Sequence, residues 1–144
     1  MEQSDWRNSV LTSPLMKIMA DNLNRSASEM VPETSPLYRA VISHMDADRT
    51  AIDIGSGVGR FAIPLALAGV KVTAVEPSDE MRRHLLASIE KEGLSSSINV
   101  IPSLWPVKRK EHFPWKLNSY FSLILSPFHY EMTWQYCFSY GIHR

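Results

Sequence analysis

The chain has 144 residues, of which 44% are hydrophobic, and its 15 basic and 15 acidic side chains give a formal net charge of zero. A chain of this length and apolar content can bury the core of one domain. The balanced charge argues against nucleic acid as the main partner. The single cysteine, Cys137, excludes an intramolecular disulfide framework and suits a reducing compartment.

The amino-terminal sequence lacks a secretory pattern, because residues 1–5 are acidic and polar instead of basic and then apolar. The longest apolar run, residues 61–70, contains Pro64 and is too short to cross a bilayer. We therefore expect a cytoplasmic protein with no membrane partner.

Helical patterns open the chain. Residues 10–23 place apolar side chains at helical spacing, and residues 36–45 form a second helical pattern that begins at the favoured pair Ser35 and Pro36. The polar residues 24–32 connect the two. We expect residues 1–48 to form an amino-terminal helical segment that serves as a lid.

Strands and helices alternate from there on. The expected strands are residues 50–54, 71–76, 98–101 and 120–125, and the expected helices are residues 60–68 and a segment that Ser78 caps and Gly93 stops. Such alternation indicates right-handed crossovers in a parallel sheet, with ligands beyond the carboxyl ends of its strands. The predicted fold class is α/β, a Rossmann-like parallel sheet with flanking helices, in a domain that covers residues 49–126.

One turn carries most of the functional information. The first strand runs through Asp53 into Gly55, Gly57 and Gly59, three glycines at alternate positions. Glycine lacks a Cβ, so such a turn lets the backbone come close to a ligand. Glu76 stands 21 residues after Gly55, at the end of the second expected strand, where nucleotide-binding folds hold a ribose.

The acid followed by three alternate glycines resembles the first motif of the class I S-adenosylmethionine-dependent methyltransferases. The resemblance covers about residues 35–130 and implies S-adenosyl-L-methionine as the methyl donor for an unidentified acceptor. It implies that Asp53 serves the methionine end, that Glu76 accepts both ribose hydroxyls, and that Met81 packs on the adenine face with Trp105 at its edge. The cofactor-binding residues expected on this basis are Asp53, Gly55, Ser56, Gly57, Gly59, Glu76, Pro77, Met81, Leu104, Trp105 and Ser126.

Members of that family usually continue for three more strands, whereas this chain stops 18 residues after Ser126. The resemblance therefore implies an abbreviated fold that holds the cofactor-binding half. The tail, residues 127–144, holds six of the chain's aromatic side chains and is expected to belong to the same domain. Because an open sheet edge has unpaired backbone groups that can bond to another chain, we expect residues 120–140 to mediate a homodimer.

Other interpretations stay open. Asp53 could merely cap its turn, and Glu76 could be a solvated acid at a strand end. The chain could be a remnant or truncated product that binds S-adenosylmethionine or its demethylated product without turnover. It could also be a fragment of a nicotinamide-dependent oxidoreductase, although Arg60 stands where the dinucleotide fingerprint has its third glycine. The histidines show no metal-ligand spacing, so we expect no metal.

Overall fold

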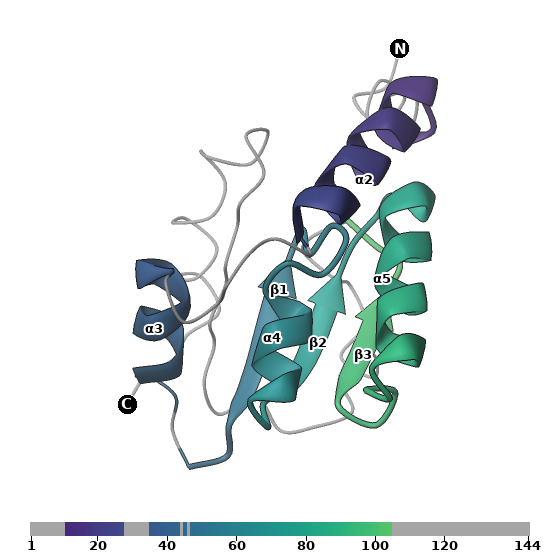
Figure 1. The fold of residues 1–144 in the computed structure, drawn as a ribbon. Coiled ribbons are helices and arrows are strands. Elements are labelled where there is room, and N and C mark those ends of the chain that lie inside the picture. Colours follow the sequence, from purple (N-terminus) through teal and green to yellow (C-terminus); the bar gives the residue numbers. More distant parts are fainter. Residues whose placement is uncertain (1–10, 28–34, 44, 46, 105–144) are drawn as a thin grey trace.

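The computed structural model describes residues 11–27, 35–43, 45 and 47–104 (Figure 1). Within this part of the chain the elements are α2 (Pro14–Ala27), α3 (Pro36–Ser43), β1 (Thr50–Ile54), α4 (Ala62–Leu67), β2 (Lys71–Val75), α5 (Asp79–Lys91) and β3 (Ile98–Ile101). The strands form one sheet in the order β1-β2-β3, and both pairings are parallel. The predicted α/β class with a Rossmann-like parallel sheet is confirmed.

The register brings the carboxyl ends of the strands to one edge of the sheet. Ile54 at the end of β1 lies opposite Val75 at the end of β2, and Val75 lies opposite Ile101 at the end of β3. α4 connects β1 to β2, and α5 connects β2 to β3. The residues that follow the strands therefore meet at a common edge, where the predicted ligand-binding residues were expected.

The main core lies between the sheet and the helices α4 and α5. Its buried members come from these elements, from α3 and from the adjoining turns, and they are Val41, Ala51, Phe61, Ala62, Leu65, Ala66, Val70, Val72, Ala74, Leu85, Ile89, Leu94 and Ile98. Every residue of β1 is buried. Burial on both faces is typical of a strand inside a parallel sheet and explains why β1 shows no alternation of polar and apolar residues.

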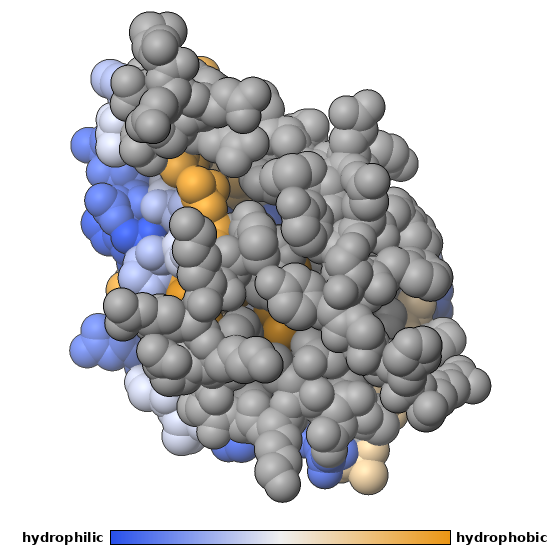
Figure 2. Space-filling model, turned by 180° about the vertical axis from the view of Figure 1, so that it is seen from behind, coloured by the Kyte–Doolittle hydropathy of each residue, from blue (hydrophilic) through white to orange (hydrophobic). Residues whose placement is uncertain are grey.

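α5 begins and ends as the sequence predicts. The Ser78 hydroxyl accepts a hydrogen bond from the Met81 backbone N–H, and Gly93 follows the last turn with a φ of +68°. The outer face of this helix is strongly charged. Figure 2, seen from behind, shows the corresponding hydrophilic surface on the left, the side on which α5 lies.

The first of the helices with described bounds, α2, differs from its expected range. α2 begins at Pro14 and ends at Ala27, whereas the pattern predicted residues 10–23. Proline has no N–H to donate and a fixed φ, so it fits the first turn of a helix and not its interior. The polar residues 24–26 then continue the helix, so the expected connector of residues 24–32 was wrong over its first part.

Several expectations fall outside the described residues. They concern the fourth strand at residues 120–125, the tail at residues 127–144, and the site residues Trp105 and Ser126. The proposed homodimer contact, residues 120–140, lies outside as well and stays a prediction. Among the helices that the structure describes, none has the length and apolar character needed to cross a membrane.

Candidate functional site

The carboxyl edge of the sheet gathers most of the residues that the sequence singled out. Asp53 is the residue before the last in β1, which leads into the glycine turn, residues 55–59. Glu76 and Pro77 join β2 to α5, whose first turn carries Met81. Leu104, partly exposed, follows β3.

The backbone of the glycine turn is bonded within the protein. The N–H groups of Gly55 and Ser56 donate to the Val75 carbonyl at 2.8 and 3.3 Å. The Gly57 N–H donates to Glu76 Oε2 at 2.8 Å, and the Gly59 N–H donates to the Ser56 carbonyl at 2.9 Å. Each of these N–H groups therefore already has an acceptor within the protein, so the turn does not offer them as hydrogen-bond donors to an anionic ligand.

Two of the glycines have different surroundings. Among the described residues, a Cβ on Gly57 would meet only the Gly55 carbonyl oxygen, at 4.0 Å, so this part of the turn can be approached closely. A Cβ on Gly59 would lie 2.6 Å from Leu85 Cδ1 and 3.0 Å from Ile63 Cγ1. Gly59 thus faces the core and allows α5 to pack against the turn.

Glu76 is a buried acid that ties the turn to α5. Its side chain accepts hydrogen bonds from the Gly57 N–H at Oε2 and from the Ser78 N–H at Oε1, both at 2.8 Å. Burial raises the pKa of Glu76, while the bonds from Ser78 and Gly57 and the charge of Arg82 act to lower it. The alternative that Glu76 is a solvated strand-end acid is therefore wrong, because only 6% of the residue is exposed.

Asp53 has a buried carboxylate oxygen with no partner in the described part of the chain. Oδ2 is buried without a hydrogen-bond partner among the described residues, as is the hydroxyl of Ser56. The backbone of Ala62, at the start of α4, favours the ionised form of the Asp53 carboxyl and acts to lower its pKa. Burial, and then the charge of Glu76, raises the pKa of Asp53 from 3.8 to about 7, against the lowering effect of the Ala62 backbone.

This shift makes stability depend on pH. The pKa of Asp53 is higher in the native state than in the unfolded state. Its contribution to the free energy of unfolding is therefore fully present below pH 3.8 and is lost as the pH rises to about 7. Between pH 5 and pH 8 the wild type should lose about 2–3 kcal/mol of unfolding free energy relative to Asp53→Asn, which cannot ionise. Urea unfolding of both proteins at the two pH values measures this difference. Parallel pH profiles would contradict a strongly perturbed Asp53.

Helix α2 lies over the start of α5 and the glycine turn (Figure 1). Ala20 of α2 is fully buried in one apolar cluster with Val58 of the turn and Met81 of α5. Three partly buried side chains of α2 pack against this cluster, namely Met16, Met19 and Leu23. Met81, the predicted adenine contact, is therefore covered by α2 in the described structure.

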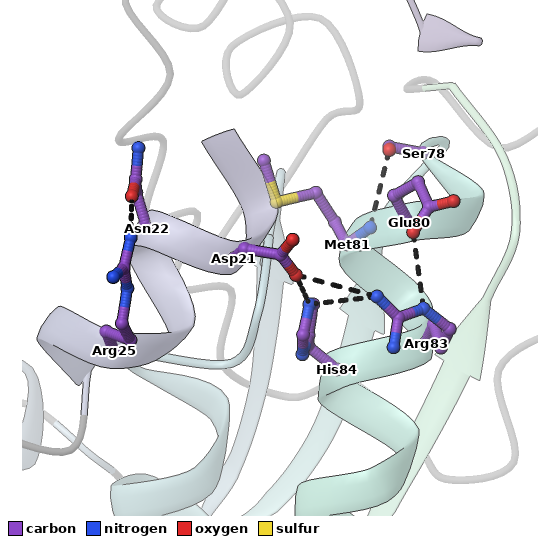
Figure 3. Close-up of polar contacts among 8 residues, drawn as sticks. All are labelled: Asp21, Asn22, Arg25, Ser78, Glu80, Met81, Arg83 and His84. Atoms are coloured by element: carbon purple, nitrogen blue, oxygen red, sulfur yellow. Dashed lines mark hydrogen bonds and ion pairs between the residues drawn. The ribbon is translucent and has the colours of Figure 1, made fainter. Parts of the chain in front are cut away.

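Polar contacts join the same two helices (Figure 3). Asp21 Oδ1 lies 2.7 Å from His84 Nε2 and 3.6 Å from Arg83 Nη2. The Arg83 guanidinium also contacts Glu80 Oε2 at 3.2 Å within α5. His84 is largely buried and Asp21 is about half exposed. This group is the polar connection between α2 and α5.

Sequence reasoning missed two parts of this arrangement. It gave no sign that α2 packs on Met81, because the partners are 61 residues apart and both helices have ordinary amphipathic patterns. It also missed Arg82, whose contact is with a backbone carbonyl that no sequence pattern marks. Among the described residues, no group of three or more histidine, cysteine or acidic side chains is placed to hold a metal ion.

No family model and no curated protein matches the chain, whereas solved structures do. A candidate S-adenosyl-L-methionine-dependent methyltransferase of Methanococcus maripaludis is 26% identical over 60% of this chain and 41% of its own, with a TM-score of 0.54. The CcbJ methyltransferase of Streptomyces caelestis is 28% identical over 44% of this chain and 26% of its own, with a TM-score of 0.41.

The N-terminal domain of human METTL16, in complex with SAH, is 28% identical over 48% of this chain and 29% of its own, with a TM-score of 0.39. The chain thus spans less than half the length of each of these structures. The structural neighbours are methyltransferases at low sequence identity, and the Methanococcus protein shares the parallel sheet with flanking helices.

Proposed function

We propose that the protein binds S-adenosyl-L-methionine at the carboxyl edge of its sheet and transfers the methyl group to an acceptor not yet identified. The observation that carries the proposal is a pair of buried acids on either side of the glycine turn. Asp53 Oδ2 has no hydrogen-bond partner in the part of the chain that the structure describes, and Glu76 is fixed against the Gly57 backbone. The similarity to the Methanococcus methyltransferase supports the same function.

The charge of the site favours this ligand over a nicotinamide dinucleotide. S-adenosylmethionine carries a sulfonium and an ammonium group. A cation near Asp53 and Glu76 opposes the effect of burial and of the Glu76 charge, which together raise the pKa of Asp53. A dinucleotide carries a pyrophosphate instead. It would meet two acids, and the N–H groups of Gly55, Ser56, Gly57 and Gly59 already have acceptors within the protein.

Four residues of the site then have defined roles. Asp53 would accept a hydrogen bond from the ammonium of the methionine end, while Glu76 would accept hydrogen bonds from the two ribose hydroxyls. Gly57 would allow close approach, and Leu104 would border the adenine. The bound donor supplies an electrophilic methyl group, and the chain contributes orientation of donor and acceptor and exclusion of water.

A binding titration tests the proposal. Calorimetry with S-adenosyl-L-methionine, S-adenosylhomocysteine and NAD should give saturable binding of the first two and none of the third. Saturable binding of NAD alone would favour the oxidoreductase fragment and overturn the proposal.

A non-catalytic binding protein is the second candidate, because the described site offers groups for the cofactor, Asp53 and Glu76, and no described residue is assigned to an acceptor. The two functions differ in turnover. Incubation of cell extract with radiolabelled S-adenosyl-L-methionine should transfer label to one class of acceptor if the protein is an enzyme. Tight binding of S-adenosylhomocysteine without transfer of label would select the non-catalytic protein.

We further propose that α2 acts as the lid expected of the amino-terminal segment. Its apolar side covers Met81 and Val58, next to the residues assigned to the cofactor, and Asp21 holds it to His84 and Arg83. Cofactor exchange would require this contact to open.

Asp21→Ala tests the lid. Because partly exposed ion pairs contribute about 0.5–1 kcal/mol, the substitution should speed cofactor dissociation about two- to fivefold. Stopped-flow displacement measures the rate, and hydrogen exchange should show faster exchange of α2 amides. Asn22→Ala is the matched control, since the Asn22 side chain contacts Arg25 within the same helix. Unchanged dissociation in Asp21→Ala would remove the lid role.

A further inference from the structure

Arg82 differs from the other basic residues of α5. Its side chain turns back along the helix, and Nη1 donates to the backbone carbonyl oxygen of Glu76 at 2.7 Å. Nη2 pairs with Asp79 in the same turn. Only 16% of the Arg82 side chain is exposed, whereas 56% of the neighbouring Arg83 side chain is exposed. Arg82 is thus directed at the strand end that carries the site's second acid.

Every polar group of Glu76 consequently takes part in a hydrogen bond. Its backbone N–H donates to the Ile101 carbonyl at 3.1 Å, and its carbonyl accepts from Arg82. Its two carboxylate oxygens accept from Gly57 and Ser78. A carboxylate oxygen has two lone pairs, so each Glu76 oxygen can accept one further hydrogen bond. The restraints leave a carboxylate of fixed orientation with one acceptor position on each oxygen.

Arg82 also supplies a compensating positive charge. Burial raises the pKa of Glu76, and the charge of Arg82 opposes that rise. Two other acids bear on this region, Asp53 from β1 and Asp79 from α5. Asp79 pairs with Arg82, and the charge of Asp53 lies close enough to Glu76 for the two acids to interact. Without Arg82, the buried carboxyl of Glu76 would keep the interaction with Asp53 and lose this opposing charge.

We infer that Arg82 is a positioning residue that keeps the Glu76 carboxylate ionised and oriented to accept both hydroxyls of a ribose. This inference rests on the proposed function. The inference adds Arg82, a residue outside the glycine motif, to the site. It also assigns Arg82 an effect on the preference for ribose over deoxyribose, because only an ionised and correctly oriented carboxylate can accept hydrogen bonds from both ribose hydroxyls. Arg82 itself need not touch the ligand.

The test compares two ligands and three variants. Calorimetry measures the affinities of S-adenosylhomocysteine and of its 2′-deoxy analogue for the wild type, Arg82→Gln, Arg82→Lys and the control Arg83→Gln. Arg82→Gln should weaken the ribose ligand about fivefold or more and the deoxy ligand less than twofold. Arg82→Lys should recover part of the preference for ribose, and Arg83→Gln, which removes an equal charge from the same helix, should keep all of it.

A ligand-free measurement accompanies the titration. NMR titration of the Glu76 side chain should show a higher titration midpoint in Arg82→Gln than in the wild type and no change in Arg83→Gln. Equal weakening of both ligands, or an unchanged midpoint, would reduce Arg82 to a structural helix residue and overturn the inference. If the wild type binds neither ligand, the proposed function is wrong. A higher Glu76 midpoint in Arg82→Gln would then still show the electrostatic interaction between Arg82 and Glu76, independently of any ligand.

Discussion

Glu76→Ala is expected to weaken binding of S-adenosyl-L-methionine about 10- to 100-fold, the effect of losing charge-assisted hydrogen bonds to the ribose. It should also lower the unfolding free energy of the ligand-free protein by about 1–3 kcal/mol, because the N–H groups of Gly57 and Ser78 lose their acceptor. Calorimetry and urea unfolding measure the two effects.

Two further variants separate these effects. Glu80→Ala removes the same charge from the first turn of α5, where Glu80 contacts Arg83, and should change neither quantity. Glu76→Gln keeps the shape of the side chain and one acceptor, so it should bind cofactor poorly while losing less stability than Glu76→Ala. Equal cofactor affinity in wild type and Glu76→Ala would remove Glu76 from the binding site.

Gly59→Ala should destabilise the fold by about 2–5 kcal/mol, even though it adds one methyl group. The new Cβ would lie 2.6 Å from Leu85 Cδ1, and Leu85 is fully buried, so α5 or the Leu85 side chain must move. The φ of Gly59, +94°, adds strain for any residue with a Cβ. Thermal and urea unfolding measure the loss.

Gly69→Ala provides the matched control. Gly69 has a similar φ of +84°, but a Cβ there would have no described neighbour within 4 Å. Its alanine variant should therefore show the backbone strain alone, about 1–2 kcal/mol. A second control, the double variant Gly59→Ala/Leu85→Ala, should lose less than the sum of its single variants, because the clash disappears. Equal losses at Gly59 and Gly69 would show that packing against Leu85 contributes nothing.

Local signals in the sequence predicted the order of the elements well. Ser78 and Gly93 bound α5 because capping depends on neighbouring residues alone. The strands at residues 50–54 and 98–101 were found from short apolar runs, and their bounds match β1 and β3. The start of α2 was missed, because the apolar pattern suggested residue 10, whereas Pro14 stands at the first position of the helix.

The candidate site could be predicted only in part. The acid, the glycines and Glu76 are visible because motif spacing reflects the length of a strand, a turn and a helix. The contacts that these residues make cannot be read from the spacing. Sequence reasoning treated the glycines alike. In the described part of the chain a Cβ on Gly57 would have no neighbour closer than 4.0 Å, whereas Gly59 faces Leu85, 26 residues further along the chain.

The sequence by itself determined the alternation of strands and helices, the parallel class of the sheet and the edge at which Asp53 and Glu76 meet. These features follow from periodicity, capping and chain connectivity, which act over a few residues or fix the direction of a strand. Only the tertiary structure decided that Glu76 accepts from the turn, that Arg82 restrains Glu76, and that α2 covers Met81. Those contacts depend on the register of the sheet and on how α2 and α5 pack, and both arise from burial shared among residues distant in sequence.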